Sequence, residues 1–400
     1  MYKKNSFKDF AANENNPKWN QMIKREQELY TKPGDIRSPF ERDFNRILHT
    51  NAYNRLKHKT QVFFSPENDH ICTRIEHVNY VESISYTISN YLGLNSELTR
   101  AIACGHDVGH GPFGHKGERI LSEISKRELG KTFWHEQNGL HIVDRIELLD
   151  DYDGNKQNLN LTYAVRDGII SHCGEIDEES IKPREEAIDL NDYKSPNQYS
   201  PFTWEGCIVK VSDKISYLGR DIEDAIEENF LTDEMLRELQ DITKAPNKTS
   251  NTSLINSFVT DICENSSPED GIRLSHESLE MMNKIKAFNY KYIYGAKRME
   301  PSHKYFELVI NQIFEILKST FDGENTQNEI KNMAKYYPNL LNNFYSWIIK
   351  YWNIENRDGL KNRVFFDINN EKDYIQAIIY YISGMTDKYA LETYNELIHF

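Results

Sequence analysis

The sequence lacks the marks of membrane proteins and of disulfide-bonded secreted proteins. No apolar run approaches the roughly 20 residues that a membrane-spanning helix needs, and residues 1–10 contain no apolar segment typical of a secretory signal. The five cysteines are scattered through 400 residues without a Cys-x-x-Cys pair. Scattered cysteines are typical of reduced thiols, so we expect a cytoplasmic protein with no disulfides and no membrane partner.

Positive charge is scarce in most of the chain. The formal net charge of −14 argues against a protein that coats nucleic acid. Residues 1–74 differ, because they carry 14 Lys and Arg against 9 Asp and Glu, whereas the remaining residues carry 34 against 53. This basic segment is compatible with attraction of an anionic ligand and equally with a solvated basic face.

Patterns typical of β-strands are also rare. Only residues 59–64 have a β-prone composition, which predicts a short strand or an extended turn that ends at Ser65-Pro66. Elsewhere apolar residues recur at helical spacing, and Gly93 stands where a helix is expected to end. The predicted helices include residues 18–30, 73–92, 96–106, 115–129, 136–150, 160–172, 207–228, 303–321 and 371–384, with another starting at residue 39.

The expected fold class is therefore all-α with few or no strands. Residues 183–203 are rich in Pro, Asn, Ser and charge and predict a surface excursion, and residues 243–253 predict a polar loop. We expect an N-terminal segment over residues 1–36, a core over residues 37–230 and a helical C-terminal region over residues 231–400 packed on that core. The chain shows no internal repeat.

The most distinctive motif lies in residues 101–118, where His106 and Asp107 are adjacent and His110 and His115 follow among glycines. An adjacent imidazole and carboxylate can bind the same ion, and this mixed donor set suits Mn, Fe, Co, Ni or Zn better than Mg. An isolated His–Asp pair more often marks only the end of a helix, so the assignment depends on partners elsewhere in the chain.

Two such partners have suitable positions. Seven of the 13 histidines lie between residues 70 and 141, a concentration that core packing does not require. If the predicted helices 73–92, 96–106 and 207–228 pack together, His77 and Asp213 converge on His106 and Asp107. Two imidazoles and two carboxylates then form a divalent-metal site with one or two positions left for water or substrate.

These residues resemble the His…His-Asp…Asp pattern of the HD-domain superfamily. Within it, the chain is similar to the deoxynucleoside triphosphate triphosphohydrolases, which are dGTPase-like. The blocks that carry the narrower resemblance occur in the family's order at residues 37–50, 52–63, 73–77, 106–118, 133–137 and 213–225. One departure is Asn54, where bacterial members usually have a second arginine. The resemblance implies an HD helical bundle with a helical C-terminal extension.

The resemblance also implies an activity and a set of catalytic residues. A divalent ion held by His77, His106, Asp107 and Asp213 would polarise the α-phosphate of a deoxynucleoside triphosphate (dNTP), and water would release deoxynucleoside and inorganic triphosphate. The implied roles of the other residues are proton donation by His115, orientation of His115 by Glu118, contact with the α-phosphate by His110 and His135, and support of His135 by Glu136. The glycines of the loop are expected to carry His110, His115 and Glu118 to the same centre.

The implied substrate contacts lie beside the metal ligands. Arg74 and Lys214 match the family's phosphate-binding positions. Tyr217 is expected to close under the deoxyribose and exclude a 2′-hydroxyl, and Asp221 with Gln61 to bind the 3′-hydroxyl. Weaker candidates for contacts with phosphate or base are Arg55, Lys59, Lys286, Tyr290 and Tyr294.

Other functions stay open from the sequence. One is a different HD phosphohydrolase that acts on cyclic nucleotides, ppGpp or nucleoside monophosphates, although the block at residues 37–63 and the His115–Glu118 pair argue against it. Another is a nucleotide- or single-stranded-DNA-binding sensor with the same fold. The resemblance implies a homo-oligomer, either a hexamer or a tetramer, and leaves open a nucleotide or single-stranded DNA effector.

Overall fold

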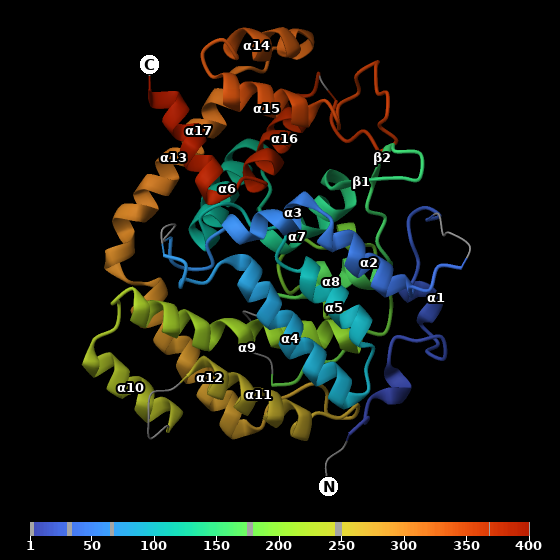
Figure 1. The fold of residues 1–400 in the computed structure, drawn as a ribbon, viewed down its shortest axis with the longest axis vertical. Helices are drawn as coiled ribbons and strands as arrows, with labels where there is room; N and C mark the ends of the chain where they lie inside the picture. Colours follow the sequence, from blue (N-terminus) through green and yellow to red (C-terminus); the bar gives the residue numbers. More distant parts are fainter. Residues whose placement is uncertain are drawn as a thin grey trace. The chain divides into compact units, whose positions relative to one another are not determined.

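A computed structural model describes residues 4–29, 34–64, 68–173, 179–244, 250–367 and 369–399. In these residues nearly all regular structure is helical, as expected for an all-α protein, and the helices run from α1 to α17 (Figure 1). The one β-sheet in the described part is a hairpin of β1, Leu148–Asp150, and β2, Lys156–Asn158. The expectation of few or no strands is therefore confirmed.

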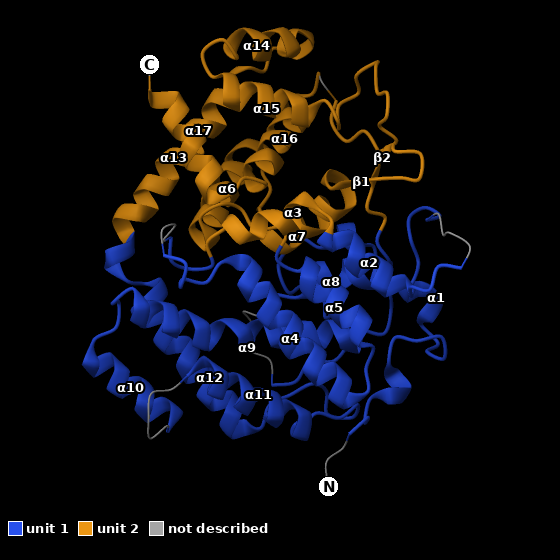
Figure 2. Ribbon diagram, viewed as in Figure 1, with its two compact units in different colours: residues 1–48, 61–107, 161–299 blue, residues 49–60, 108–160, 300–400 orange. Residues whose placement is uncertain are grey.

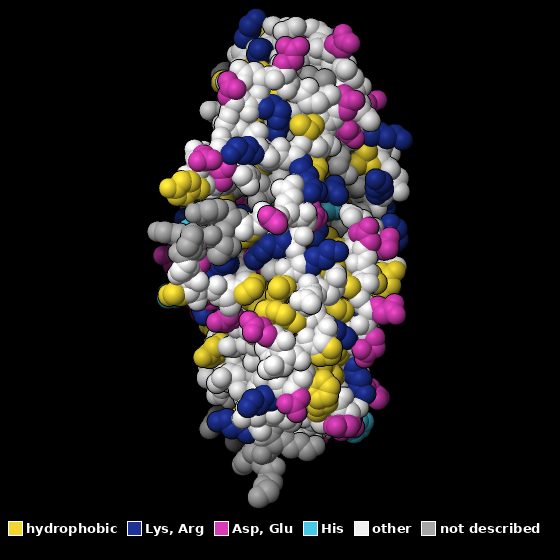
Figure 3. Space-filling view, turned by 90° about the vertical axis from the view of Figure 1, so that its right-hand side faces the viewer, with side chains coloured by type: hydrophobic (Ala, Val, Ile, Leu, Met, Phe, Trp, Pro, Cys, Tyr) yellow, Lys and Arg dark blue, Asp and Glu magenta, His cyan; other side chains and the backbone are white. Residues whose placement is uncertain are grey.

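The surface mixes charges of both signs. On the face shown in Figure 3, Lys and Arg side chains are interspersed with Asp and Glu, and hydrophobic side chains occur singly or in small groups. The most exposed large hydrophobic residues are Ile36 and Tyr152, at 99% and 85%. Among the described residues, no helix combines the length and the hydropathy that a membrane crossing requires.

The chain forms two compact units that alternate along the sequence (Figure 2). Unit 1 comprises Met1–Leu48, Gln61–Asp107 and Leu161–Met299, and unit 2 comprises His49–Thr60, Val108–Asn160 and Glu300–Phe400. The sequence suggested domain boundaries at residues 36 and 230. These boundaries stay a prediction, because each compact unit is defined by contacts and consists of several separate stretches of the chain.

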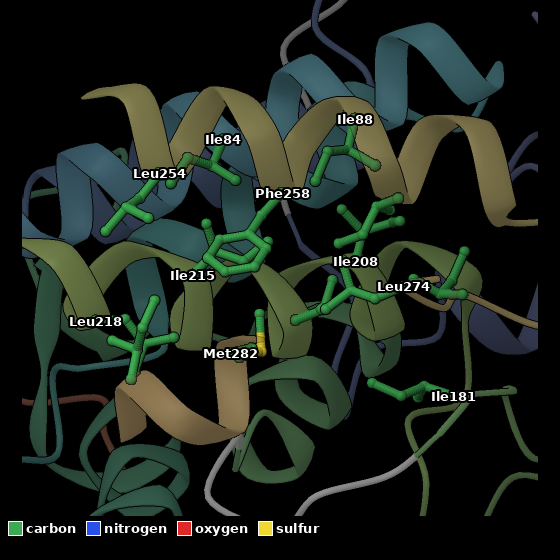
Figure 4. Close-up of a cluster of buried hydrophobic side chains, with 14 of the residues drawn as sticks. Ile84, Ile88, Ile181, Ile208, Ile215, Leu218, Leu254, Phe258, Leu274 and Met282 are labelled. Atoms are coloured by element: carbon green, nitrogen blue, oxygen red, sulfur yellow. The ribbon is translucent and has the colours of Figure 1, made fainter. Parts of the chain in front are cut away.

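Unit 1 has a core in which α4 packs on α5 and α9, and α9 packs on α11. Its helices are α1 Trp19–Met22, α2 Pro39–Leu48, α4 Arg74–Leu92, α5 Ser96–Gly105, α8 Tyr163–Ser171, α9 Trp204–Glu227, α10 Asp233–Thr243, α11 Asn251–Asn265 and α12 His276–Asn289. Ile84 and Ile88 of α4 face Ile208 and Ile215 of α9, with Phe258 of α11 in the same cluster (Figure 4). This packing holds α4 and α9 rigidly in place.

Local signals set the ends of the two central helices. In α4, the backbone N–H of Thr73 donates to Glu76 Oε2 at 2.8 Å, as part of a capping box, and Gly93 ends the helix at φ 84°. In α9, Thr203 Oγ1 accepts from the N–H of Gly206 at 3.1 Å. Because these capping residues lie within a few residues of the helix ends, such helix ends can be predicted from the sequence.

Unit 2 is built around α6, which packs against both α13 and α16. Its helices are α3 Asn51–Arg55, α6 Gly114–Leu129, α7 His135–His141, α13 Glu300–Ser319, α14 Thr326–Met333, α15 Pro338–Ile348, α16 Glu371–Ser383 and α17 Asp387–Ile398. A buried hydrogen bond of 2.6 Å joins Thr320, just after α13, to Tyr374 of α16. The C-terminal helices thus complete the core of this unit.

Three expectations from the sequence need correction. In place of the helix expected over residues 18–30, the described part contains only the short helix α1, because Arg25 leaves the helical path to pair with Asp43 at 2.6 Å. Tyr30 lies outside the described residues. The helix expected over residues 136–150 gives way to a π-helical segment, Ile142–Ile146, and then to β1. Residues 59–64 form no named strand, so of the two alternatives from the sequence the extended turn is the one compatible with the structure.

The third correction concerns residues 183–203, which are not a simple surface excursion. Arg184 pairs with buried Asp167 and donates to the carbonyl of Ser200 at 2.7 Å. Tyr193 and Phe202 are buried at 1% and 2% exposure. The segment is anchored because aromatic burial outweighs its polar composition. In the polar loop expected over residues 243–253, residues 245–249 lie outside the described residues, and α11 already begins at Asn251.

Candidate functional site

Three helices of unit 1 bring the four predicted metal ligands together. His77 lies on α4, His106 caps the end of α5 with Asp107 next in the chain, and Asp213 lies on α9. His77 Nε2 is 3.0 Å from Asp213 Oδ1 and 3.4 Å from His106 Nε2. His106 Nε2 is in turn 3.7 Å from Asp107 Oδ1. The side chains of the two histidines and Asp107 are buried, and that of Asp213 is 17% exposed.

The donor set fits a divalent cation. His106 Nδ1 lies 2.6 Å from the carbonyl of Ala103, so it donates there and the lone pair of the neutral ring is on Nε2. That lone pair lies close to Nε2 of His77 and 3.9 Å from Asp213 Oδ1. Electron-rich nitrogen and oxygen atoms crowd together this way only around a proton or a metal ion, and mixed imidazole and carboxylate donors suit a transition metal.

The electrostatics of the cluster agree with a site for positive charge. Burial raises the pKa of Asp213, but the hydrogen bond and charge of His77, together with His106 and His172, outweigh it and hold the pKa below its ordinary value. Burial lowers the pKa of His106, and the Asp107 and Asp213 carboxylates oppose this only in part. For His77, the hydrogen bond to Asp213 overcomes burial and raises the pKa. A metal ion would therefore compete with a proton for His77.

A buried arginine completes the metal side of the cluster. Arg74 lies three residues before His77 on α4, and its Nη1 donates to Asp107 Oδ2 at 2.7 Å. Its side chain is 1% exposed, yet Nε and Nη2 make no hydrogen bond to any described residue. Leaving such donors unsatisfied is costly, so the guanidinium is suited to an anion. Lys214, which follows Asp213 on α9, is also buried.

A second polar group lies further along α9. Asp221 Oδ2 accepts from the Tyr294 hydroxyl at 2.5 Å, whereas its Oδ1 has no hydrogen-bond partner among the described residues. Burial, with repulsion from Asp224, raises the pKa of Asp221 to about 7 against the opposing hydrogen bond from Tyr294. Gln61 is buried and its Oε1 likewise has no partner in the described part. Tyr217, one turn before Asp221, is half-buried.

The raised pKa of Asp221 predicts a dependence of stability on pH. A folded Asp221 keeps its proton to about pH 7, whereas an unfolded aspartate releases it near pH 4, so this group makes the protein less stable as the pH rises from 5 to 8. In Asp221→Asn the amide oxygen still accepts from Tyr294, and the free energy of unfolding should fall less over this range. The expected difference is on the order of 1.4 kcal/mol per pKa unit.

Urea denaturation at pH 5 and pH 8 measures this difference, with exposed Asp192→Asn as the control that removes a surface carboxylate. The control should lose stability with pH as the wild type does. If Asp221→Asn did the same, the raised pKa would be wrong.

The remaining predicted catalytic residues form a cluster in unit 2. His110 precedes α6, His115 and Glu118 lie in its first turns, and His135 and Glu136 begin α7. The rings of His110 and His135 stack with centroids 3.7 Å apart and planes at 18°. His135 Nδ1 lies 3.4 Å from Glu136 Oε2. The side chain of His115 is 55% exposed, and the other four are largely buried.

Glu118 is the centre of this cluster. Its Oε2 lies 3.1 Å from His135 Nδ1, 3.8 Å from His110 Nδ1 and 4.0 Å from His115 Nδ1, and its Oε1 accepts from the backbone N–H of His135. Burial raises the pKa of Glu118, but the three histidines outweigh it and hold the pKa well below the ordinary value. Glu118 is therefore ionised and holds His135 more closely than His115, which the sequence had suggested as its main partner.

The glycine loop before α6 is held in an unusual conformation. A Cβ at Gly109 would lie 2.0 Å from the carbonyl oxygen of His135, so only glycine allows this approach of the two segments. Phe113 adopts φ 63°, and its N–H donates to Asp387 Oδ1 at 2.8 Å. Lys59 donates to the carbonyl of His110 and, at 2.8 Å, to that of Ser383. The loop is thus fixed by residues distant in the sequence.

Comparison with known proteins identifies the family of the chain. A family model described as HD domain matches residues 74–218, which include all four predicted metal ligands. A protein of Caldanaerobacter subterraneus subsp. tengcongensis called deoxyguanosinetriphosphate triphosphohydrolase-like is 32% identical over 364 residues, or 91% of this chain and 86% of its own. The chain belongs to this dGTPase-like family of HD-domain proteins. Similar proteins of the same name occur in Rickettsia bellii, 31% identical over 94% of this chain and 96% of its own, and in Desulfatibacillum aliphaticivorans, 30% identical over 91% and 89%.

Sequence reasoning missed some residues around the clusters of this family member. His172, at the end of α8, forms a group with His106 and Asp107 in which one ligand atom from each lies within 4.8 Å of the others. The sequence did contain a signal for His172, because this histidine stands at the end of an apolar helix as His106 does. Asp387 and Ser383 were missed because the last hundred residues show no chemical motif.

Two arginines of the basic N-terminal segment pair with acidic residues of the same segment. Arg25 pairs with Asp43 at 2.6 Å, and Arg37 pairs with Asp35 at 2.8 Å. Arg25, Arg37 and other residues line a cavity of about 610 Å³ in unit 1. Acidic residues of the same segment thus neutralise Arg25 and Arg37, whereas Arg74 of that segment lies buried beside the predicted metal ligands. Of the weaker candidates, Arg55 pairs with Glu147 at 3.1 Å.

Proposed function

We propose that the protein is a metal-dependent triphosphohydrolase that converts dNTPs to deoxynucleosides and inorganic triphosphate. The observation that carries the proposal is the convergence of His77, His106, Asp107 and Asp213 beside Arg74, whose buried Nε and Nη2 lack partners among the described residues. An ion site beside a buried cation suits a phosphate ester. Membership of the dGTPase-like family supports the same chemistry.

The ion, bound by these four residues, would supply polarisation of a phosphate oxygen and activation of water. We assign the ligand set to a divalent ion, either magnesium, or manganese or another transition metal such as Fe, Co, Ni or Zn. Arg74 and Lys214 would bind phosphate oxygens and offset the negative charge of the triphosphate. Because Arg74 also donates to Asp107, it links the position of a metal ligand to that of the substrate.

The polar group at the far part of α9 is assigned to the sugar. Tyr217 would lie under the deoxyribose and exclude a 2′-hydroxyl by steric contact. Asp221 Oδ1 and Gln61 Oε1, both buried without a partner in the described residues, would accept from the 3′-hydroxyl or from water beside it. A site built to bind one hydroxyl discriminates strongly against substrates that lack it.

The cluster of unit 2 is assigned to proton transfer. His115 is the most exposed of its histidines and would donate a proton to the leaving 5′-oxygen. His110 and His135, held by Glu118 and with Glu136 beside His135, would stabilise the negative charge of the phosphate.

Product analysis tests the proposal. The protein is incubated with each dNTP and each NTP in the presence of Mn²⁺ or Mg²⁺, and the products are separated by chromatography. Deoxynucleoside and inorganic triphosphate are expected from dNTPs, with little product from NTPs because Tyr217 excludes the 2′-hydroxyl. Monophosphate with pyrophosphate, or orthophosphate alone, would show a different phosphohydrolase.

Family resemblance also supports two further proposals, one on the oligomeric state and one on an effector. We expect a homo-oligomer, either a hexamer or a tetramer, which light scattering of the active protein measures. A nucleotide or single-stranded DNA effector would be detected as a change in the rate of hydrolysis when it is added at saturating substrate.

A further inference from the structure

His172 is a buried histidine next to the metal ligands with no role assigned by the family pattern. It is 1% exposed and caps the C-terminal end of α8. Its Nδ1 lies 2.7 Å from the carbonyl of Ile169, to which it donates. In the neutral ring the lone pair is therefore on Nε2, the atom through which the ring would bind a metal ion.

The arrangement of His172 repeats that of His106. Each residue caps its helix, and each donates from Nδ1 to the carbonyl three residues earlier, Ile169 for His172 and Ala103 for His106. The two rings are in edge-to-face contact, with centroids 5.0 Å apart and planes at 80°. A hydrogen bond from the second ring nitrogen to a carbonyl is the usual way in which a metal-binding histidine is oriented.

The ligand atoms around His172 are close enough for one ion. One atom each of His106, Asp107 and His172 lies within 4.8 Å of the others, and the same is true of His77, His106 and Asp213. Both groups include His106, whose Nε2 has a single lone pair and can bind only one ion. Because His106 is common to both groups, we take them as one centre, to which His172 would add a fifth protein ligand.

We propose that His172 is a fifth protein ligand of the divalent ion, and that its imidazole biases the site toward transition metals over Mg²⁺. This inference rests on the metal site of the proposed function. Three imidazoles and two carboxylates form a nitrogen-rich set that favours Mn²⁺, Fe²⁺, Co²⁺, Ni²⁺ or Zn²⁺, whereas Mg²⁺ prefers oxygen ligands and retains several waters.

Cobalt binding to the metal-free full-length protein tests the proposal. Co²⁺ is titrated into the wild type, His172→Gln and the control His276→Gln, which removes an exposed histidine from α12, and the visible absorption is recorded. One Co²⁺ per chain is expected for all three. The affinity of His172→Gln for Co²⁺ should fall about 10-fold or more, with an altered spectrum, whereas its affinity for Mg²⁺ should change little. Equal Co²⁺ affinity and spectrum in His172→Gln, or two Co²⁺ per chain in the wild type, would overturn the proposal.

Two further measurements do not depend on the folding of that variant. His172→Cys places a thiolate at the same position, so Co²⁺ should produce a new sulfur-to-cobalt charge-transfer band in the near ultraviolet. X-ray absorption of the Co²⁺-loaded wild type should require three imidazoles, and a fit with only two would exclude His172. Because these readouts do not use hydrolysis, wild type that binds Co²⁺ through three imidazoles but releases no triphosphate from dNTPs would contradict the proposed function alone.

Discussion

Replacing Asp213 by asparagine is expected to abolish metal binding and to lower the rate of dNTP hydrolysis by about 10³-fold or more. The substitution removes the carboxylate that lies 3.0 Å from His77 and 3.9 Å from His106. An amide is a much weaker ligand, and loss of the ion would remove several kcal/mol of transition-state stabilisation, at about 1.4 kcal/mol per tenfold in rate. Metal content after dialysis and the single-turnover rate measure the two effects.

Glu223→Gln is the matched control, because it removes a carboxylate from the same helix, ten residues further along α9. It should retain metal and rate. Thermal unfolding of both variants separates loss of the ion from loss of the fold. If Asp213→Asn retained the metal and hydrolysed dNTPs at the wild-type rate, the ligand assignment would be wrong.

His115→Gln is expected to retain the metal and to lose about 10²- to 10⁴-fold in rate, the range typical of general acid–base groups. His115 lies on α6 in unit 2 and is not among the metal ligands, so Co²⁺ affinity should match that of the wild type. Its exposure of 55% makes the substitution compatible with folding. The rate under single-turnover conditions, measured from pH 5 to pH 9, should also lose the limb that reports the protonated histidine.

His303→Gln serves as the control for this variant, because His303 lies on α13 of the same unit outside the cluster. It should hydrolyse dNTPs as the wild type does. Near-full turnover by His115→Gln would remove His115 from the role of proton donor. The close pair of Glu118 and His135 would then be the next group to substitute.

The helices that carry the metal ligands could be predicted because their signals are local. The expected helix over residues 73–92 is α4, Arg74–Leu92, and the one over residues 207–228 is α9, Trp204–Glu227. Capping residues and apolar spacing act within a few residues, so a single sequence contains them. The convergence of the four ligands then follows from packing of the apolar faces of these helices.

The residues that the sequence could not reveal depend on contacts between distant segments. Asp387 binds the N–H of Phe113 across 274 positions, and no local pattern indicates that pairing. The sequence offered Tyr294 only as a weaker candidate for contact with phosphate or base, and its hydrogen bond to Asp221 from a π-helical turn after α12 was not foreseen. His172 escaped notice because a histidine at a helix end has many ordinary uses, and only the packed structure places it beside His106.

The alternating order of the two units has a consequence for synthesis of the chain on the ribosome. Asp387 receives hydrogen bonds from the N–H groups of Thr60 and Phe113, both at 2.8 Å, yet it is made more than 270 residues after Phe113. The hydrogen bond that holds the glycine loop to Asp387 therefore cannot form until α17 has emerged. A nascent chain that already contains all four proposed metal ligands still lacks the anchor of the loop that carries His110.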